Sequence, residues 1–325
     1  MSGSVETPTH ETGPSGPRAG TAQLTVLNGM ASRDFDQALS VIKGWGLEWV
    51  DLWGSIYGEP VDVLSPAAAE RAAAALGERG LRAYCLSSRV FDDSVEQDEQ
   101  VFRAKHLGTL RKALAAATVL RPRYVRLIAG KMTGTTVGGN RVALLRKEHP
   151  WVREVYAEAV DLIVDAGFEP TIENEHQDCF LSTVDEYRDF FEWLGAPSRL
   201  TFTWDIVNAW KMGVYPTVEV YRALRPLLGY VHVKGGQADE HDPERLRWNV
   251  GLDQSSWPVR EILQAVVDDG ASPVICLNPA HGEWKPGYDY GDGSAASTPI
   301  FERNFAPVTE RDINFLRKNV GGIVQ

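Results

Sequence analysis

Eight short apolar runs, each followed by a longer stretch with helical periodicity, make up almost all of this chain after residue 22. Apolar runs of about four to eight residues are typical of buried strands, and longer periodic stretches are typical of helices that pack against them. We expect strands over residues 24–28, 49–53, 82–87, 124–128, 169–173, 200–205, 230–234 and 274–278. We expect helices over residues 34–45, 66–78, 151–165, 184–194, 218–227, 259–267 and 310–319, with a further one ending near residue 117.

The regular alternation predicts parallel βαβ units, because a crossover helix returns the chain to the same end of the sheet. Eight such units close a (β/α)₈ barrel, and 325 residues is an ordinary length for that architecture. An open doubly wound sheet is the alternative, but no Gly-x-Gly-x-x-Gly sequence opens a helix after the first strand. We therefore predict a single-domain α/β protein with a TIM barrel over residues 23–325.

Residues 1–22 differ from the rest in composition. They are rich in Ser, Thr, Gly and Pro and lack the apolar centre of a signal peptide. A segment with so few apolar side chains cannot bury enough surface to offset the entropy of ordering it, so we predict a disordered N-terminal tail.

Composition excludes several classes of partner. The formal charge of −11 argues against a nucleic-acid partner, and no apolar run is long enough to span a bilayer. The three cysteines, Cys85, Cys179 and Cys276, are single and dispersed, which is not the pattern of a disulfide framework. We expect a cytoplasmic protein, because unpaired cysteines suit a reducing compartment.

Three connections are unusually long, at residues 129–150, 235–256 and 279–309. Each follows a predicted strand, so each falls at the C-terminal face of the barrel. The active sites of such barrels lie at this face, and long loops there usually shape or cover a pocket.

Four consecutive strands are predicted to bring polar side chains to this face. Side chains alternate across a strand, so the apolar residues of one parity face the helices and those of the other parity point into the barrel. The inward residues at or near the strand ends are Glu173, Asp205, His232 and Asn278. Buried carboxylates are costly unless they are paired or bind a cation, so we predict a site for Mn²⁺, Mg²⁺ or Zn²⁺. The alternative interpretation is a structural salt-bridge network.

Four segments together resemble the xylose isomerase-like TIM barrel superfamily, the sugar phosphate isomerase/epimerase family. Residues 172–174 (Ile-Glu-Asn) resemble its Leu-Glu-Asn metal-ligand motif, and residues 204–208 (Trp-Asp-Ile-Val-Asn) its Asp-x-x-His element. Residues 231–234 (Val-His-Val-Lys) resemble its His-x-Lys strand, and residues 249–253 (Asn-Val-Gly-Leu-Asp) its Gly-x-Gly-x-Ile-Asp loop. The resemblance implies a metal-dependent isomerase or epimerase that acts on a sugar or polyol through an enediolate-type intermediate.

Two positions depart from the family pattern. Asn278 occupies the place of the family's fourth ligand, a glutamate, and Asn208 occupies that of a histidine that contacts substrate. An amide oxygen can ligate a hard cation, but it cannot transfer a proton. Two alternatives therefore stay open: a lyase on the same scaffold, such as a dehydratase or the catalytic subunit of a C-glycoside-cleaving enzyme, and a non-catalytic binding barrel.

Further residues near the predicted strand ends are candidates for catalysis or for substrate binding. Glu173, Lys131 and His281 are the candidate catalytic groups, and the other acid or base candidates are Glu175, His176, Lys234 and Glu283. The candidate substrate-binding residues are Asn208, Lys234, Glu175 and Trp53. We expect a small carbohydrate-like substrate, and either a homo-oligomer or a small partner subunit would be compatible with the resemblance.

Overall fold

A computed structural model describes residues 20–132, 139–175, 178–195, 199–279, 283–289, 291 and 303–324. All but the last three residues of the predicted N-terminal tail lie outside this part of the chain. The first described residues are attached to the C-terminal end, since Ala22 forms a parallel bridge with Ile323.

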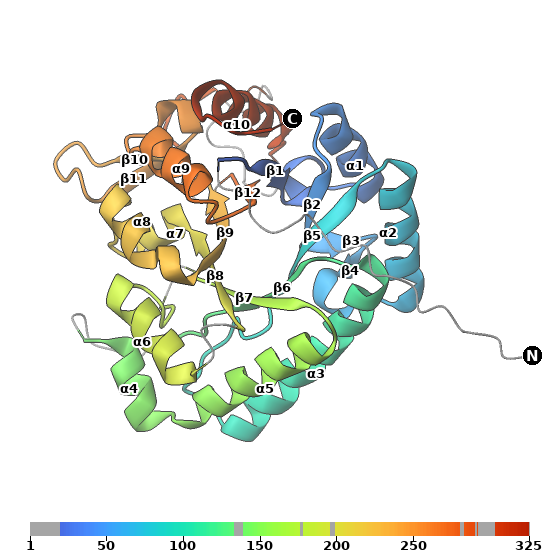
Figure 1. Cartoon of the computed structure of the whole chain (residues 1–325), viewed down its shortest axis with the longest axis vertical. Coiled ribbons are helices and arrows are strands. Elements are labelled where there is room, and N and C mark those ends of the chain that lie inside the picture. The colour runs from blue at the N-terminus through green and yellow to red at the C-terminus, as the bar shows by residue number, and fades with distance from the viewer. Residues whose placement is uncertain are drawn as a thin grey trace, which may run out of the picture.

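Eight parallel strands form the centre of the fold (Figure 1). They are β1 (Gln23–Val26), β2 (Trp49–Trp53), β5 (Arg82–Ser87), β6 (Tyr124–Ile128), β7 (Glu169–Glu173), β8 (Thr201–Asp205), β9 (Leu228–Val233) and β12 (Val274–Leu277). The sheet runs in the order β1-β12-β9-β8-β7-β6-β5-β2, and a parallel bridge between Leu27 and Asp51 joins its two edges. The predicted single-domain (β/α)₈ barrel is confirmed.

Helices surround the strands on the outside (Figure 1). They are α1 (Phe35–Gly44), α2 (Pro66–Glu78), α3 (Glu99–Leu120), α4 (Arg141–Glu148), α5 (Trp151–Asp165), α6 (Val184–Leu194), α7 (Ile206–Lys211), α8 (Val218–Leu224), α9 (Val259–Asp268) and α10 (Ala306–Asn319). Short 3₁₀ turns are η1 (Asn28–Met30), η2 (Val61–Val63), η3 (Arg225–Leu227) and η4 (Leu252–Gln254). No helix in the described ranges is long and apolar enough to cross a membrane.

Several predicted boundaries differ from the structure for identifiable reasons. The helix expected to end near residue 117 continues to Leu120, where Arg121 takes a left-handed conformation and Pro122 prevents further helix. The last helix begins at Ala306, earlier than expected, because Pro307 suits the first turn of a helix. The sequence analysis also missed the two small hairpins, β3 (Ser55–Ile56) with β4 (Glu59–Pro60) and β10 (Gly235–Ala238) with β11 (Leu246–Val250).

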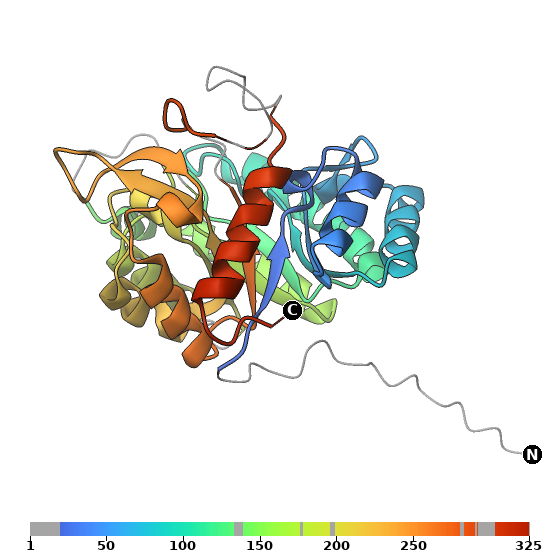
Figure 2. The same ribbon diagram turned by 90° about the horizontal axis from the view of Figure 1, so that it is seen from above.

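The barrel interior is apolar at one end and polar at the other. Tyr84, Tyr124 and Tyr230 pack against one another with ring centroids 5.0–6.0 Å apart, and Trp49 packs against Tyr84. These rings fill the interior below the strand ends, so the polar residues gather above them, at the C-terminal face. Figure 2 shows the hairpin β10–β11 projecting at that face.

We expect the protein to lose folding stability in acid because of His106, in α3. His106 is buried, and its Nδ1 accepts a hydrogen bond from the Phe91 amide at 2.9 Å, which requires a neutral ring. Burial, helped by the Lys105 charge and opposed by Asp93, lowers the pKa of His106 from 6.5 to about 4. Because the unfolded chain binds the proton at higher pH, this contribution is present above pH 6.5 and is lost as the pH falls toward 4. At about 1.4 kcal/mol per pKa unit, we expect a loss of up to roughly 3 kcal/mol.

Urea unfolding of wild type and His106→Asn at pH 7 and pH 4.5 measures this loss. The asparagine oxygen can accept the Phe91 hydrogen bond but does not titrate. The stability advantage of wild type over the variant should therefore shrink at the lower pH. An advantage of equal size at both pH values would contradict the prediction.

Candidate active site

The four predicted metal-ligand residues come together at the C-terminal mouth of the barrel. Glu173 ends β7, Asp205 ends β8, His232 lies in β9 and Asn278 directly follows β12. All four are buried, and the register places Asp205 beside His232. The strand positions follow from the alternation in the sequence, since the intervening apolar residues pack against the helix layer.

Glu173 is held by two cationic or ionisable side chains. Arg126, in β6, donates to Glu173 Oε2, and His232 Nδ1 lies 2.9 Å from Glu173 Oε1. Burial alone would raise the pKa of Glu173, but the Arg126 guanidinium and His232 together lower it to about 2. The same carboxylate raises the pKa of His232 well above its usual value, against the effect of burial. Glu173 is therefore an anion at neutral pH, with both oxygens engaged.

Asp205 has a second set of partners. Lys234 Nζ lies 2.6 Å from Asp205 Oδ2, and Asn278 Nδ2 lies 3.4 Å from the same oxygen. Asp205 Oδ1 caps α7 by accepting from the Asn208 amide at 3.0 Å. Asn174 fixes the Asp205 backbone through its side chain, donating to the carbonyl at 3.0 Å and accepting from the amide at 2.9 Å. The carboxylate is thus held at the strand end with one oxygen toward Lys234.

Arg126 and Lys234 neutralise part of the carboxylate charge. The sequence analysis had expected a metal ion to neutralise it. Each carboxylate of the cluster has a buried basic partner, so a salt-bridge network exists in the described residues. This network leaves one polar atom without a hydrogen bond, because Asn278 Oδ1 is buried without a hydrogen-bond partner, whereas both ring nitrogens of His232 face carboxylates. Such atoms are uncommon in proteins and point to a missing partner.

The donor set fits a divalent cation. Ligand atoms of Glu173, Asp205 and His232 all lie within 4.8 Å of one another. Donors about 2.0–2.2 Å from one ion are necessarily within about 4.4 Å of each other, so small movements suffice. Two carboxylates, an imidazole and the unpartnered Asn278 oxygen are ligands that Mg²⁺, Mn²⁺ and Zn²⁺ accept.

Three of the candidate substrate-binding residues, Asn208, Lys234 and Glu175, lie around this cluster. Asn208 Nδ2 donates to Glu175 Oε2 at 3.3 Å, and Lys234 Nζ donates to Asn208 Oδ1 at 3.3 Å. Burial, followed by the Glu173 charge, raises the pKa of Glu175 to about 7. Trp53, at the end of β2, packs against the residues that fill the barrel interior. Gly235 lets the chain turn away after Lys234, because a Cβ there would lie 2.2 Å from the Val250 carbonyl oxygen.

The other catalytic candidates do not join the cluster in the described residues. Lys131 Nζ lies 2.5 Å from Asp92 Oδ1, in a pair at the rim. Glu283 is exposed and faces Arg247 at 3.8 Å. His281 and His176 lie outside the described residues.

Sequence reasoning missed Arg126, Asp51 and Lys211, and it named Asn174 only as part of the Ile-Glu-Asn segment. Arg126 has the inward parity of its strand, and an arginine in the middle of an apolar run was a readable signal. Asp51 likewise shares inward parity with Trp49 and Trp53. Lys211 ends α7, and burial, with the Lys234 charge, lowers its pKa to about 8. No sequence pattern pointed to Lys211.

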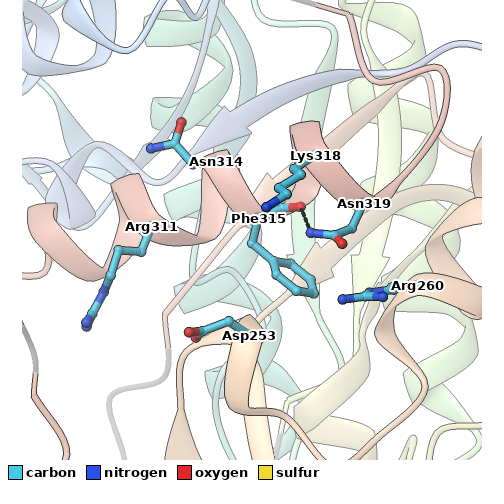
Figure 3. A pocket seen from close by; sticks show the side chains of 7 residues that line it. All are labelled: Asp253, Arg260, Arg311, Asn314, Phe315, Lys318 and Asn319. Atoms are coloured by element: carbon cyan, nitrogen blue, oxygen red, sulfur yellow. Dashed lines mark hydrogen bonds between the residues drawn. The ribbon is translucent and has the colours of Figure 1, made fainter.

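A hollow of about 460 Å³ lies elsewhere, beside α10, between that helix, α9 and η4 (Figure 3). Arg260, Arg311, Lys318 and Asp253 are among its lining residues. It is on the outside of the barrel and contains none of the candidate ligands.

Comparison with solved structures identifies the fold. No protein-family model and no curated protein matches the chain. A D-psicose 3-epimerase studied in the presence of D-fructose matches with a TM-score of 0.67 at 13% identity, over 93% of this chain and 100% of that chain. The probable 3-DHS dehydratase AsbF from Bacillus anthracis matches with a TM-score of 0.64 at 16% identity, over 91% and 98%. A xylose isomerase-like TIM barrel protein from Mycobacterium smegmatis, in complex with magnesium, gives 0.63 at 15% identity, over 92% and 96%.

These similarities confirm the expected resemblance at the level of the fold. The chain has the architecture of the xylose isomerase-like TIM barrels over almost the whole length of those proteins. At such low identities, the chemistry has to be argued from the residues of this chain.

Proposed function

We propose that this protein is a divalent-metal-dependent isomerase or epimerase that acts on a sugar or polyol through an enediolate-type intermediate. The observation that carries the proposal is the convergence of Glu173, Asp205, His232 and Asn278 at the barrel mouth, with the Asn278 oxygen left without a partner. An epimerase and a magnesium complex among the structures of the same fold support it.

The four residues are proposed as ligands of the cation. When bound, a divalent ion would polarise a substrate carbonyl or hydroxyl group and stabilise the negative charge of the enediolate. Lys234 and Asn208 would hold substrate hydroxyl groups, since both present polar atoms beside the ligands. Trp53 would contribute an apolar surface at the mouth.

We propose Glu175 as the group that transfers the proton. Glu173 Oε2 is held by Arg126, and Oε1, which faces His232, is the oxygen proposed to ligate the cation, so neither oxygen is free to act as a base. Glu175 stands two residues further along the chain, and its Oε2 is held by Asn208. Lys131 is less suited to the role because its ammonium is paired with Asp92.

Bound metal is the first test. The protein, purified without chelator, should carry near-stoichiometric metal by elemental mass spectrometry, and Asp205→Ala and His232→Ala should lose it. Asp253→Ala, an exposed carboxylate outside the cluster, is the matched control and should retain the metal. Because Mg²⁺ exchanges easily, an empty wild type is retested by thermal shift with added Mg²⁺, Mn²⁺ and Zn²⁺. No binding in either experiment would end the metal mechanism.

Proton transfer is tested by solvent exchange. Ketohexoses such as D-psicose and D-fructose, incubated with enzyme and metal in deuterium oxide, should gain deuterium beside the carbonyl, detected by mass spectrometry. An enediolate mechanism produces this exchange when the base shares the removed proton with solvent before it returns one. A metal-loaded protein that exchanges no proton in any sugar of a broad panel would point to the non-catalytic binding barrel.

A lyase is the second candidate, and Asn278 is the observation that favours it. Epimerisation through two opposed carboxylates needs a proton-transferring group at this position, whereas an elimination needs one base. The fold similarity to a probable dehydratase agrees with this alternative. A C-glycoside-cleaving enzyme would additionally require a small partner subunit, which copurification with its gene neighbour would reveal.

Asn278→Glu separates the two candidates. The carboxylate adds a charged ligand where Asn278 Oδ1 has no partner, so we expect metal affinity to rise by about one order of magnitude. In an epimerase the new base should also preserve or raise the rate of deuterium exchange. In a lyase it should leave product formation unchanged or lower it, because the added anion opposes the charge that develops during elimination. Unchanged metal affinity would contradict the assignment of Asn278 as a ligand.

A further inference from the structure

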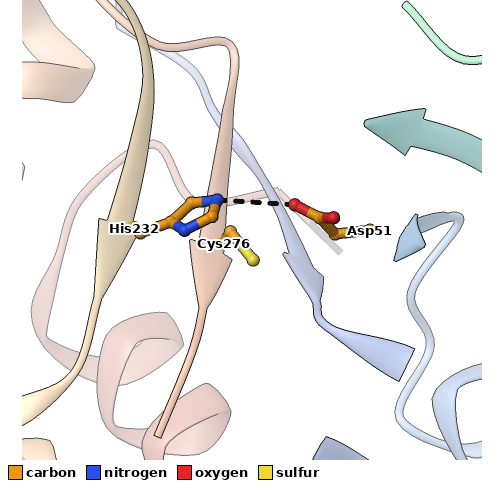
Figure 4. Close-up of side chains that lie close together, drawn as sticks. All are labelled: Asp51, His232 and Cys276. Carbon is orange, nitrogen blue, oxygen red and sulfur yellow. Dashed lines mark ion pairs between the residues drawn. The ribbon is translucent and has the colours of Figure 1, made fainter. Parts of the chain in front are cut away.

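The His232 ring lies between two carboxylates. One is the proposed ligand Glu173, and the other, on the opposite side of the ring, is Asp51. His232 Nε2 lies 3.4 Å from Asp51 Oδ2 (Figure 4). The other ring nitrogen, Nδ1, lies 2.9 Å from Glu173 Oε1. Asp51 belongs to β2 and reaches the ring across the barrel interior. Both side chains are completely buried, so no solvent competes for this contact.

Asp51 is itself held in place. Tyr230 donates its hydroxyl hydrogen to Asp51 Oδ2 at 2.9 Å, and the Asp51 backbone forms the bridge to Leu27 that joins the sheet edges. The pairing of β2 with β5 shifts register between Val50 and Asp51, which adjusts the direction of this side chain. The carboxylate is therefore a fixed acceptor, with Oδ1 buried and lacking a hydrogen-bond partner.

His232 Nε2 also lacks a hydrogen bond. His232 Nε2 and Asp51 Oδ2 lie 3.4 Å apart, and a carboxylate oxygen that accepts from Tyr230 can accept a second hydrogen, so a small rotation of the ring would form a charge-assisted hydrogen bond. Metal-binding histidines almost always donate their other ring N–H to a carboxylate or carbonyl, which fixes the tautomer and the ring orientation.

We propose that Asp51 is a positioning residue, which accepts the Nε2 proton of His232 and so directs the Nδ1 lone pair toward the cation site at Glu173 and Asp205. This inference rests on the proposed metal function.

Cys276 completes a second cluster with Asp51 and His232, whose donor atoms also lie within 4.8 Å of one another (Figure 4). A neutral imidazole presents one lone pair, so the ring serves one cation, not both clusters. The Asp51 side lies deeper, against Tyr230 and the apolar interior, where a substrate could not reach a metal. Because a substrate could reach a metal only at the shallower cluster, the cation belongs on the Glu173 side of the ring.

Zinc binding separates this role from a merely structural one. The dissociation constant for Zn²⁺ is measured by chelator competition on folded protein, with Asp51→Leu and Asp51→Asn as variants. Asp51→Leu removes the acceptor, and we expect an increase of about 10–100-fold. Asp51→Asn keeps an oxygen acceptor, so the increase should stay below about fivefold. Cys276→Ser is the matched control and should bind like wild type within about twofold.

A nitrogen NMR measurement reports the tautomer directly. In zinc-loaded protein with ¹⁵N-labelled histidine, the His232 signals, assigned with His232→Gln, should show a protonated Nε2 and a metal-bound Nδ1. In Asp51→Leu the Nε2 proton should exchange rapidly with solvent or the ring should populate both orientations. If Asp51→Leu fails to fold, Tyr230→Phe serves instead. That change removes the hydrogen bond that holds Asp51 Oδ2 in place but keeps the carboxylate charge. The less well oriented carboxylate should weaken zinc binding severalfold.

The outcomes distinguish the two proposals. Wild-type affinity and tautomer in folded Asp51→Leu, or in Tyr230→Phe where it is used, would overturn the positioning role and leave the metal function standing. Loss of zinc in Cys276→Ser as large as in Asp51→Leu would place the cation in the deeper cluster and overturn the inference. A wild type that binds no cation would end the proposed function and this inference with it.

Discussion

Replacing Arg126 with leucine should destabilise the protein by about 3–5 kcal/mol, the largest effect on stability that we expect from any single substitution at the site. Arg126 is buried and donates to Glu173 Oε2, and it also donates to the carbonyl oxygens of Ser87 at 3.1 Å and Ser88 at 3.2 Å. Removing the guanidinium leaves a buried carboxylate without its strongest partner and two carbonyl groups unsatisfied.

The double variant Arg126→Leu/Glu173→Gln shows whether the charge is the cause. Because glutamine is neutral, it should recover a large part of the loss, giving a coupling energy of about 2 kcal/mol or more in a double-mutant cycle. Urea denaturation provides the free energies. Arg123→Leu is the control, since its pair with the half-exposed Glu169 should contribute about 1 kcal/mol or less. Equal losses for Arg126→Leu and Arg123→Leu would contradict the buried-charge explanation.

Arg126 also shows what pattern reasoning could and could not provide. The strand over residues 124–128 was predicted with its observed bounds, because a run of apolar residues between helices has few other interpretations. Its parity places Arg126 inside the barrel. Whether an inward arginine pairs with Glu173 depends on how adjacent strands are staggered, and the alternation of residues along one strand carries no information about that stagger.

The ligand cluster was predictable for a related reason. Glu173, Asp205, His232 and Asn278 each stand at or near a strand end with the parity opposite to that of their apolar neighbours. In a parallel barrel all strand ends of one kind meet at one face, so strand position and parity together determine convergence. Strand position and parity could not predict the role of Asp51. It contacts His232 from across the barrel, and such contacts depend on barrel diameter and side-chain length.

The loops were the least predictable part. Hairpin β10–β11 occupies much of the connection expected at residues 235–256, and it forms because Gly235 and Gly236 allow close approach to the returning strand. Only part of the long connection at 279–309 lies within the described residues, and His281 lies outside them. Assignments that depend on loop geometry, including those of His281 and His176, therefore remain predictions.

Glu175→Gln should lower the rate of deuterium exchange by about 10²–10⁴-fold, the contribution typical of a general acid or base. Glutamine keeps an oxygen that can accept from Asn208 Nδ2, so the local structure should persist while proton transfer is lost. Metal affinity should change by less than about threefold, because Glu175 is not a proposed ligand. Glu173→Gln should instead lose metal and exchange together, and Glu283→Gln, an exposed carboxylate after β12, should leave both unchanged. Wild-type exchange in Glu175→Gln would transfer the role of base to another group, with Glu173 the nearest alternative, since a bound cation would take His232 Nδ1 away from its Oε1.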